Sequence, residues 1–292
     1  MKGDSHMPKK KEIRYLAGWE VDFHDEDFLR SYLAVHGVNK KGFNFFKEVQ
    51  SAIELEIEGD TAVRVLNEHK EVIEQNVPLP LTQWNDHEIF FLEKHPKGNH
   101  KLGGDIPGEF TLPTIESTNI KFHYIGTLDG KDPHFSWLGI DSLHIAYPLN
   151  DLNFGIYLDY SNPNKPIVIN PDTFNDDWHD PELETDEDIT FTETHFKSTT
   201  KINIEKYLDG SDLILCGVPL WYQAPKVPIC PKTNQTMKFV CSINSDHDIV
   251  ANVNDDSRQY LCFGNSLCFG DFGHLFIFWN PESRIMHINI QF

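Results

Sequence analysis

Short apolar runs closed by turn residues dominate the C-terminal part of the chain. The clearest is Leu275-Phe276-Ile277-Phe278-Trp279, which follows Gly270-Asp271-Phe272-Gly273 and precedes Asn280-Pro281. Aromatic and β-branched residues enclosed by Gly and Asn-Pro turns are typical of buried antiparallel strands. We therefore predict that 260–292 forms a core hairpin and not a catalytic loop.

Strict alternation of apolar and acidic residues marks a second hairpin at 51–67. Apolar residues alternate with glutamates up to the turn at Gly59-Asp60, and Val63 and Val65 alternate on the return. A period of two places the apolar side chains on one face of a sheet and the acids on the other. The acidic face is either a solvated surface or a docking ladder for a partner. Its members are Glu54, Glu56 and Glu58.

The remaining N-terminal patterns mix strand and helix. We predict a strand within 13–21, a helix over 28–36 and a further strand at 89–92. Asp25-Glu26-Asp27 opens the helix and Gly37 ends it, as expected for acids in a first turn and glycine beyond the last one.

Three segments recur in the same order, which indicates an internal duplication. The matched pairs are 272–281 with 154–163, 238–246 with 121–129, and 216–219 with 103–107. We predict an α+β fold that is predominantly antiparallel β, with two duplicated β-rich subdomains and a smaller N-terminal α/β portion. The boundaries are 1–7 (an expression scar), 8–98 (N-terminal portion), 99–171 (first repeat), 172–212 (acidic linker) and 213–292 (second repeat).

The predicted linker contains a dense run of acidic residues. Such a run cannot bury itself, so we expect an exposed connection or a partner-binding segment. It lacks the spacing and the turn glycine of an EF-hand loop. Its acids are Asp176, Asp177, Asp180, Glu182, Glu184, Asp186, Glu187 and Asp188.

The net charge limits the class of partner. Among 292 residues, 45 acidic and 25 basic side chains give a formal charge of −20. Nucleic-acid backbones and anionic membranes would be repelled, so neither is a predicted partner. A basic protein is the natural alternative; the acidity also fits a role in solubility alone.

Cysteine usage and hydropathy favour the cytoplasm. The five cysteines are an odd number without a CxxC pair, which indicates buried thiols in a reducing compartment. No apolar run reaches the roughly 18 residues that a membrane span needs, and no apolar signal-peptide core follows the basic start.

Familiar catalytic motifs are missing from the sequence. The 15 histidines have no zinc-ligand spacing, and no nucleophile elbow or phosphate-binding glycine loop occurs, so no cofactor or metal is predicted. Asp271 is interpreted either as a turn residue that bonds backbone amides or as a carboxylate in a cleft between the repeats. A pocket in such a cleft would be lined by Gly104, Pro107, Gly217, Pro219, Trp221 and Asp271.

Over about 100–292 the chain resembles the YwqG-like family of bacterial proteins. The resemblance lies in Gly103-Gly104-Asp105-Ile106-Pro107, in Cys230-Pro231-Lys232-Thr233, and in the GD-x-G strand motif within 269–278. It implies a duplicated, β-rich α+β fold and brings no established reaction. Thr233 stands where some relatives have a second cysteine, so a metal role is not carried over.

Two functional hypotheses follow. The first is a non-catalytic acidic binding protein, most specifically a bacterial immunity protein that acts as a toxin inhibitor by occluding a basic cognate toxin. The alternative is a YwqG-like cytosolic enzyme or small-ligand-binding protein with a pocket between the repeats. The identity of the partner and the oligomeric state are not encoded in these patterns.

Overall fold

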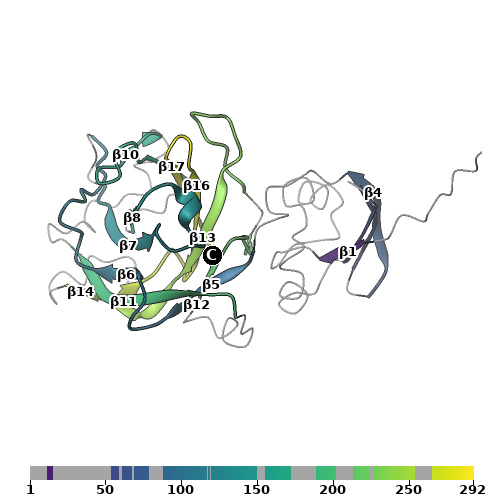
Figure 1. The fold of residues 1–292 in the computed structure, drawn as a ribbon, viewed down its shortest axis with the longest axis horizontal. Helices are drawn as coiled ribbons and strands as arrows, with labels where there is room; N and C mark the ends of the chain where they lie inside the picture. The colour runs from purple at the N-terminus through teal and green to yellow at the C-terminus, as the bar shows by residue number, and fades with distance from the viewer. Residues whose placement is uncertain are drawn as a thin grey trace, which may run out of the picture. The chain divides into compact units, whose positions relative to one another are not determined.

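The structure is a computed structural model that describes residues 12–15, 54–58, 61–67, 69–78, 88–116, 118, 120–149, 155–171, 189–201, 213–223, 226–253 and 265–292. The chain divides into two compact units (Figure 1). Unit 1 comprises Met1–Glu88 with Leu220–Lys226, and unit 2 comprises Ile89–Pro219 with Val227–Phe292.

Unit 1 contains a four-stranded antiparallel sheet in the order β1-β2-β3-β4. Its strands are β1 (Glu12–Tyr15), β2 (Glu54–Glu58), β3 (Thr61–Leu66) and β4 (Val72–Pro78). The predicted hairpin at 51–67 is confirmed as β2 and β3, with Leu55 and Ile57 buried. The alternation therefore specified both the strand type and its apolar face.

A β-bulge changes the expected pattern on the return strand of this hairpin. Ile57 pairs with Ala62 and Glu56 with Arg64, so Val63 is the extra residue of the bulge. Ala62 and Val65 are buried, whereas Val63 is only half-buried. The prediction that Val63 shares the buried face is wrong, because a bulge shifts the side-chain alternation by one residue.

Unit 2 contains a 13-stranded antiparallel sheet that curls into a half-barrel (Figure 1). Its main path runs β10-β9-β17-β16-β13-β12-β5-β11-β6-β7-β8, and β14 and β15 branch from β11. The strands are β5 (Phe90–Lys94), β6 (His100–Gly104), β7 (His123–Asp129), β8 (Ser142–Tyr147), β9 (Ile156–Asp159), β10 (Ile167–Val168), β11 (Thr190–Thr199), β12 (Leu213–Cys216), β13 (Lys238–Asn244), β14 (Asp246–Asn252), β15 (Ser266–Leu267), β16 (His274–Asn280) and β17 (Ile285–Gln291).

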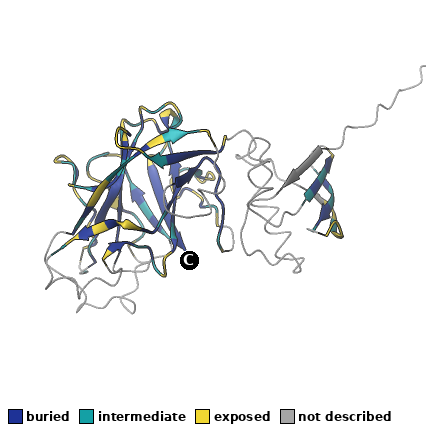
Figure 2. Ribbon diagram, turned by 90° about the horizontal axis from the view of Figure 1, so that it is seen from below, coloured by how far each residue is buried: buried dark blue, intermediate teal, exposed yellow. Residues whose placement is uncertain are grey.

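The predicted core hairpin is confirmed as β16 and β17, which pair from His274–Gln291 to Asn280–Ile285. Figure 2 shows how far the strands of the large sheet are buried. On one face Ile277 and Ile288 join the main core, and on the other Phe278 packs edge-on against Phe239 at a centroid distance of 5.4 Å. Burial on both faces explains the continuous apolar run, which an amphipathic strand would not need.

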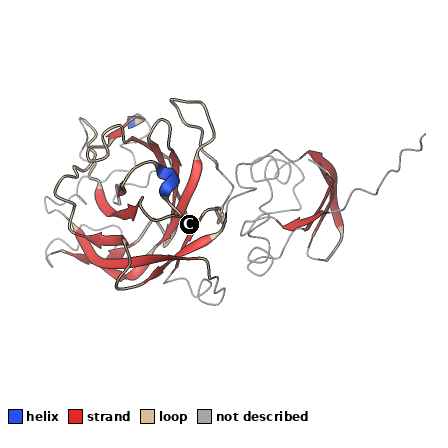
Figure 3. Ribbon diagram, viewed as in Figure 1, coloured by secondary structure: helices blue, strands red, loops and turns tan. Residues whose placement is uncertain are grey.

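Helix is almost absent from the described residues, so the α+β label is not supported (Figure 3). The helical element there is the 3-10 turn η1 (Ser136–Leu138). The predicted helix over 28–36 lies outside the described residues. Short apolar runs pair into strands instead, as at 89–92, where β5 confirms the prediction. In the same ranges no helix has the length and apolar character that a bilayer crossing requires.

The predicted linker over 172–212 contains β11, which pairs with β5, β6 and β14. Phe191 and Phe196 of β11 are buried, so 190–199 belongs to the sheet and is not a solvated connection. The dense acidic run at 176–188 lies outside the described residues.

The strand order gives a mixed picture of the duplication. The series β12-β13-β16 and β6-β7-β8 are both runs of three antiparallel neighbours in the sheet, which agrees with two of the matched segment pairs. The third pair does not agree, because 274–280 lies beside β13 whereas 156–159 forms β9 beside β17. The duplication therefore stays a prediction.

Candidate interaction surface

The predicted acidic ladder on β2 is largely compensated by neighbouring cations. Glu56 pairs with Arg64 on β3 at 3.2 Å, and Glu54 pairs with Lys70. The side chains of Glu54 and Glu56 are only 13% and 14% exposed, whereas Glu58 is exposed. Two of the three carboxylates are therefore bound within the protein and present little charge to a partner.

The two glycines predicted to line a pocket lie at opposite ends of the strands. Gly104 pairs with Phe191 at the start of β11. Gly217 lies near the other end of β11. Its neighbour Cys216 pairs with Phe90 of β5, and the next residue of β5, Phe91, pairs with Thr199, the last residue of β11. At about 3.3 Å per residue along β11, the two ends are roughly 25 Å apart. Gly104 and Gly217 do not meet in the sheet.

The other residues predicted to line the pocket belong to several different segments of the chain. Pro107 is half-buried after β6, and Pro219 is buried after β12. Trp221 is fully buried and groups with unit 1. Asp271 is exposed in the turn before β16, close to the last residues of β13. The Gly217 amide donates to the Val240 carbonyl near the first residues of β13, so Asp271 and Gly217 lie toward opposite ends of that strand.

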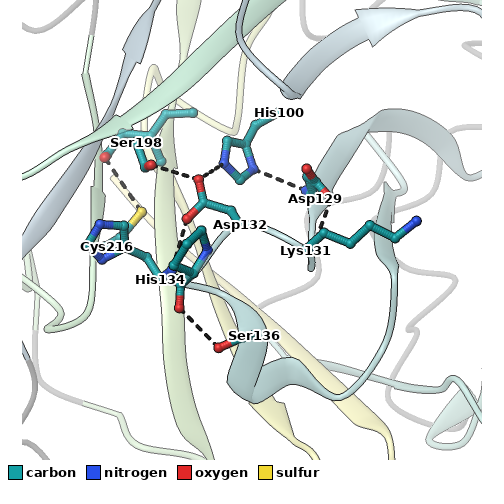
Figure 4. A network of polar contacts seen from close by, with 10 residues as sticks. His100, Asp129, Lys131, Asp132, His134, Ser136, Ser198 and Cys216 are labelled. Carbon is teal, nitrogen blue, oxygen red and sulfur yellow. Dashed lines mark hydrogen bonds and ion pairs between the residues drawn. The ribbon is translucent and has the colours of Figure 1, made fainter.

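A partly buried polar cluster joins three distant parts of unit 2 (Figure 4). Asp132 Oδ2 accepts hydrogen bonds from Ser198 Oγ at 2.7 Å and from His100 Nε2 at 3.2 Å. The opposite ring nitrogen, His100 Nδ1, accepts the backbone N–H of Asp129 at 3.1 Å. The cluster thereby ties β6, the loop after β7 and β11 together.

The order of these side chains does not form a Ser-His-Asp triad. A triad places the histidine between serine and aspartate so that its free nitrogen takes the serine proton. Here Asp132 is in the middle, and both nitrogens of His100 are occupied. Burial lowers the pKa of His100, so the neutral ring is favoured. For Asp132, burial acts to raise the pKa, but hydrogen bonds from Ser198, the His134 amide and His100 lower it overall.

Sequence reasoning did not find this cluster, because its members are far apart in the chain and none belongs to a recognisable motif. Elsewhere in the described ranges, no three His, Cys, Asp or Glu side chains converge as a metal site requires.

The turn at 270–273 is held by the backbone and by a buried serine. The Gly273 amide donates to the Phe269 carbonyl at 2.7 Å. Ser245 Oγ donates to the Gly273 carbonyl at 2.8 Å and accepts from the Phe269 amide at 2.9 Å. These bonds define the turn without the Asp271 side chain, so the carboxylate is left at the surface.

Phe272 in this turn combines exposure with an unusual backbone conformation. Its φ is +61°, in the left-handed region that bulky residues rarely adopt, and 45% of its surface is exposed. Its ring stacks on His247 of β14, with a centroid distance of 4.1 Å and an interplanar angle of 28°. A large apolar side chain is thus held at the surface by a strained turn, a feature that clusters at functional sites.

Further side chains extend this surface. Phe292 is 40% exposed, and its ring lies so close to Gly270 that a Cβ there would be 2.6 Å from the ring. Asp248, next to His247, has a side chain 78% exposed, and Lys94 approaches both Asp248 (3.3 Å) and Asp246 (2.9 Å). We name this surface the aromatic–acidic edge: His247, Asp248, Asp271, Phe272 and Phe292.

Comparisons with protein-family models, with curated proteins and with solved structures found no match for this chain. The aromatic–acidic edge is therefore assessed from its own chemistry.

Proposed function

We propose that this chain is a non-catalytic binding protein for a basic protein, and most specifically a bacterial immunity protein that occludes a cognate toxin in the cytoplasm. The proposal includes membership of the YwqG-like family and a duplicated β framework that presents a binding surface. The observation that carries it is Phe272, which a strained turn holds at the surface next to the exposed Asp271 and stacked on His247, the chain neighbour of the exposed Asp248.

The chemistry of the aromatic–acidic edge suits an arginine- or lysine-rich partner. Asp248 and Asp271 supply negative charge, and Lys94, which pairs with Asp246 at 2.9 Å and with Asp248 at 3.3 Å, offsets part of the charge of Asp248. An arginine guanidinium can stack on Phe272 while pairing with a carboxylate. The formal charge of −20 would also speed encounter with a basic protein through long-range attraction.

The described residues favour this edge over the ladder on β2. Glu54 and Glu56 are paired with Lys70 and Arg64 and are only 13–14% exposed, whereas the side chain of Asp248 is 78% exposed beside Lys94 and Asp271 is exposed. Glu58 and the acids at 176–188 remain predicted contacts of the same basic partner. The enzyme alternative gains no support from the cluster of Asp132, because its order is not that of a Ser-His-Asp triad.

The test is a binding measurement between the purified chain and the product of the adjacent open reading frame. We expect binding whose association rate falls about tenfold or more between low and high salt. Substituting both carboxylates (Asp248→Asn with Asp271→Asn), or Phe272→Ala alone, should weaken affinity about tenfold.

Matched controls come from exposed side chains outside this edge. Ile167 on β10 is 60% exposed, and the Asp141 side chain is 82% exposed. Ile167→Ala and Asp141→Asn should leave affinity within about twofold of the original. Absence of binding would contradict the immunity function, and unchanged binding by Phe272→Ala would show that the partner docks elsewhere.

A further inference from the structure

Two cysteines face each other in the middle of the large sheet. Cys216, the last residue of β12, is the direct cross-strand partner of Cys241 on β13. Both are free thiols, both are 0% exposed, and both belong to the main core. Their side chains therefore lie on the same face of the sheet.

The hydrogen-bond pattern places this pair at the closer of the two kinds of cross-strand position. The Gly217 amide donates to the Val240 carbonyl at 3.4 Å, so Gly217 and Val240 form the hydrogen-bonded pair. In an antiparallel ladder the adjacent pair, Cys216 and Cys241, is then non-hydrogen-bonded. Such pairs have Cα atoms about 4.5 Å apart, within the range of about 4.4–6.8 Å that disulfides span.

The cross-strand neighbours of the two thiols are apolar, and Cys216 Sγ also contacts the Ile214 carbonyl of its own strand at 3.7 Å. Cys216 pairs on its other side with Phe90, and Cys241 with Ile277, so neither neighbouring strand places a charged partner there. The other cysteines of the described residues are engaged elsewhere. Cys230 Sγ contacts Ser283 Oγ at 3.1 Å, and Cys268 Sγ contacts the Gly270 carbonyl at 3.5 Å.

We propose that Cys216 and Cys241 are a cross-strand disulfide site, which a low-molecular-weight disulfide oxidises while the chain folds or when these strands open. The thiolate of one cysteine attacks a sulfur of the small disulfide, forms a mixed disulfide and releases one small thiol. The second cysteine then attacks the protein sulfur of the mixed disulfide and releases another. Two protein thiols are oxidised to one S–S bond, the small disulfide is reduced to two thiols, and the two protein protons end on those thiols.

The folded protein should protect the reduced pair. Burial raises the pKa of the Cys216 thiol, and its proximity to Cys241 raises it further. Both side chains are 0% exposed, so small oxidants should not reach either thiol in the native state. The reduced protein would then stay reduced in the cytoplasm, whereas a chain that folds in an oxidising medium would form the bond.

The decisive experiment is oxidative refolding of the full chain. The reduced chain is unfolded in denaturant, refolded with a mixture of reduced and oxidised glutathione, and alkylated in denaturant. We expect peptide mapping of the refolded chain to recover a peptide in which Cys216 is joined to Cys241. Native protein that is kept in the same glutathione mixture without unfolding should retain both cysteines as free thiols, which react with the alkylating agent only once denaturant is added. The bond closes a loop around 217–240, so the thermal midpoint should rise by about 5–10 °C and fall back on reduction.

Controls separate this pairing from accidental oxidation. Cys230→Ser and Cys268→Ser should still form the bond, whereas Cys216→Ser and Cys241→Ser should lose both the linked peptide and the rise of the midpoint. Recovery of both cysteines as alkylated peptides after oxidative refolding would overturn the proposal. A linked peptide that joins Cys216 or Cys241 mainly to a different cysteine would also overturn the proposal. Both of these results come from the original chain, so they do not depend on a variant that folds.

Discussion

His123 is a neutral imidazole buried at the start of β7. Its exposed fraction is 5%, and Nδ1 accepts the Leu149 amide at 3.3 Å. Burial is the main cause that lowers the pKa of His123 to about 4, and Lys121 adds to it. In the unfolded chain the ring titrates near its ordinary pKa of 6.5, so the unfolded state binds more protons below that pH. The stability contributed by neutral His123 is therefore present above pH 6.5 and lost as the pH falls toward 4.

Replacing His123 should flatten the acid side of the stability profile. Between about pH 7 and about pH 5, the His123 pKa difference predicts a loss of about 2 kcal/mol in the free energy of unfolding. His123→Asn keeps an acceptor for the Leu149 amide without a titrating ring, so its loss over this window should be smaller by about that amount. Urea unfolding at both pH values measures the difference. Parallel profiles for the two proteins would show that His123 titrates in the folded state with the same pKa as in the unfolded state.

At the scale of elements, the contact between β6 and β7 depends on a glycine. A Cβ at Gly126 would lie 2.3 Å from the Lys101 carbonyl oxygen and 2.8 Å from Leu102 Cδ2. Gly126 is the direct cross-strand partner of Leu102 in the pairing of β6 with β7. The two backbones meet more closely there than any side chain allows.

Gly126→Ala should therefore separate β6 from β7 and reduce the free energy of unfolding by about 1–3 kcal/mol. Denaturant unfolding measures this loss. Gly108→Ala is the matched control, because a Cβ at Gly108 has no atom within 4 Å, and its effect should be within about 0.5 kcal/mol. Equal stability of the two variants would mean that the strands relax without cost.

At the scale of the whole molecule, charge repulsion opposes folding. The formal net charge is −20, and close ion pairs such as Lys94–Asp246 and Lys232–Asp159 compensate only part of it. Exposed charges repel over distances comparable to the screening length, so added salt should weaken the repulsion more than the close, partly buried pairs.

We expect the thermal midpoint to rise by a few degrees when NaCl is raised from about 20 mM to about 300 mM. A salt titration of thermal unfolding, followed by circular dichroism, tests this expectation. A midpoint that falls with salt would show that attractive ion pairs outweigh the net repulsion.

The local sequence pattern determined those strands whose apolar and polar residues follow a clear period. Alternation at 54–58 and the apolar run at 275–279 each specify strand type and burial within a few residues, because the side-chain period depends only on the backbone. The acidic composition likewise predicts a basic partner without any knowledge of the fold. The bulge at Val63 could not be predicted from the alternation of residues along the chain, because it arises from the pairing of β3 with β2.

Tertiary structure alone decided which distant segments meet. β11 lies within a predicted linker yet occupies the sheet between β5 and β6, and Asp132 joins His100 to Ser198 across three elements. Phe272 stacks on His247, and Cys216 faces Cys241, through pairings that no local period encodes. The physical reason is that strand type depends on neighbours along the chain, whereas strand order depends on how the whole apolar surface is buried.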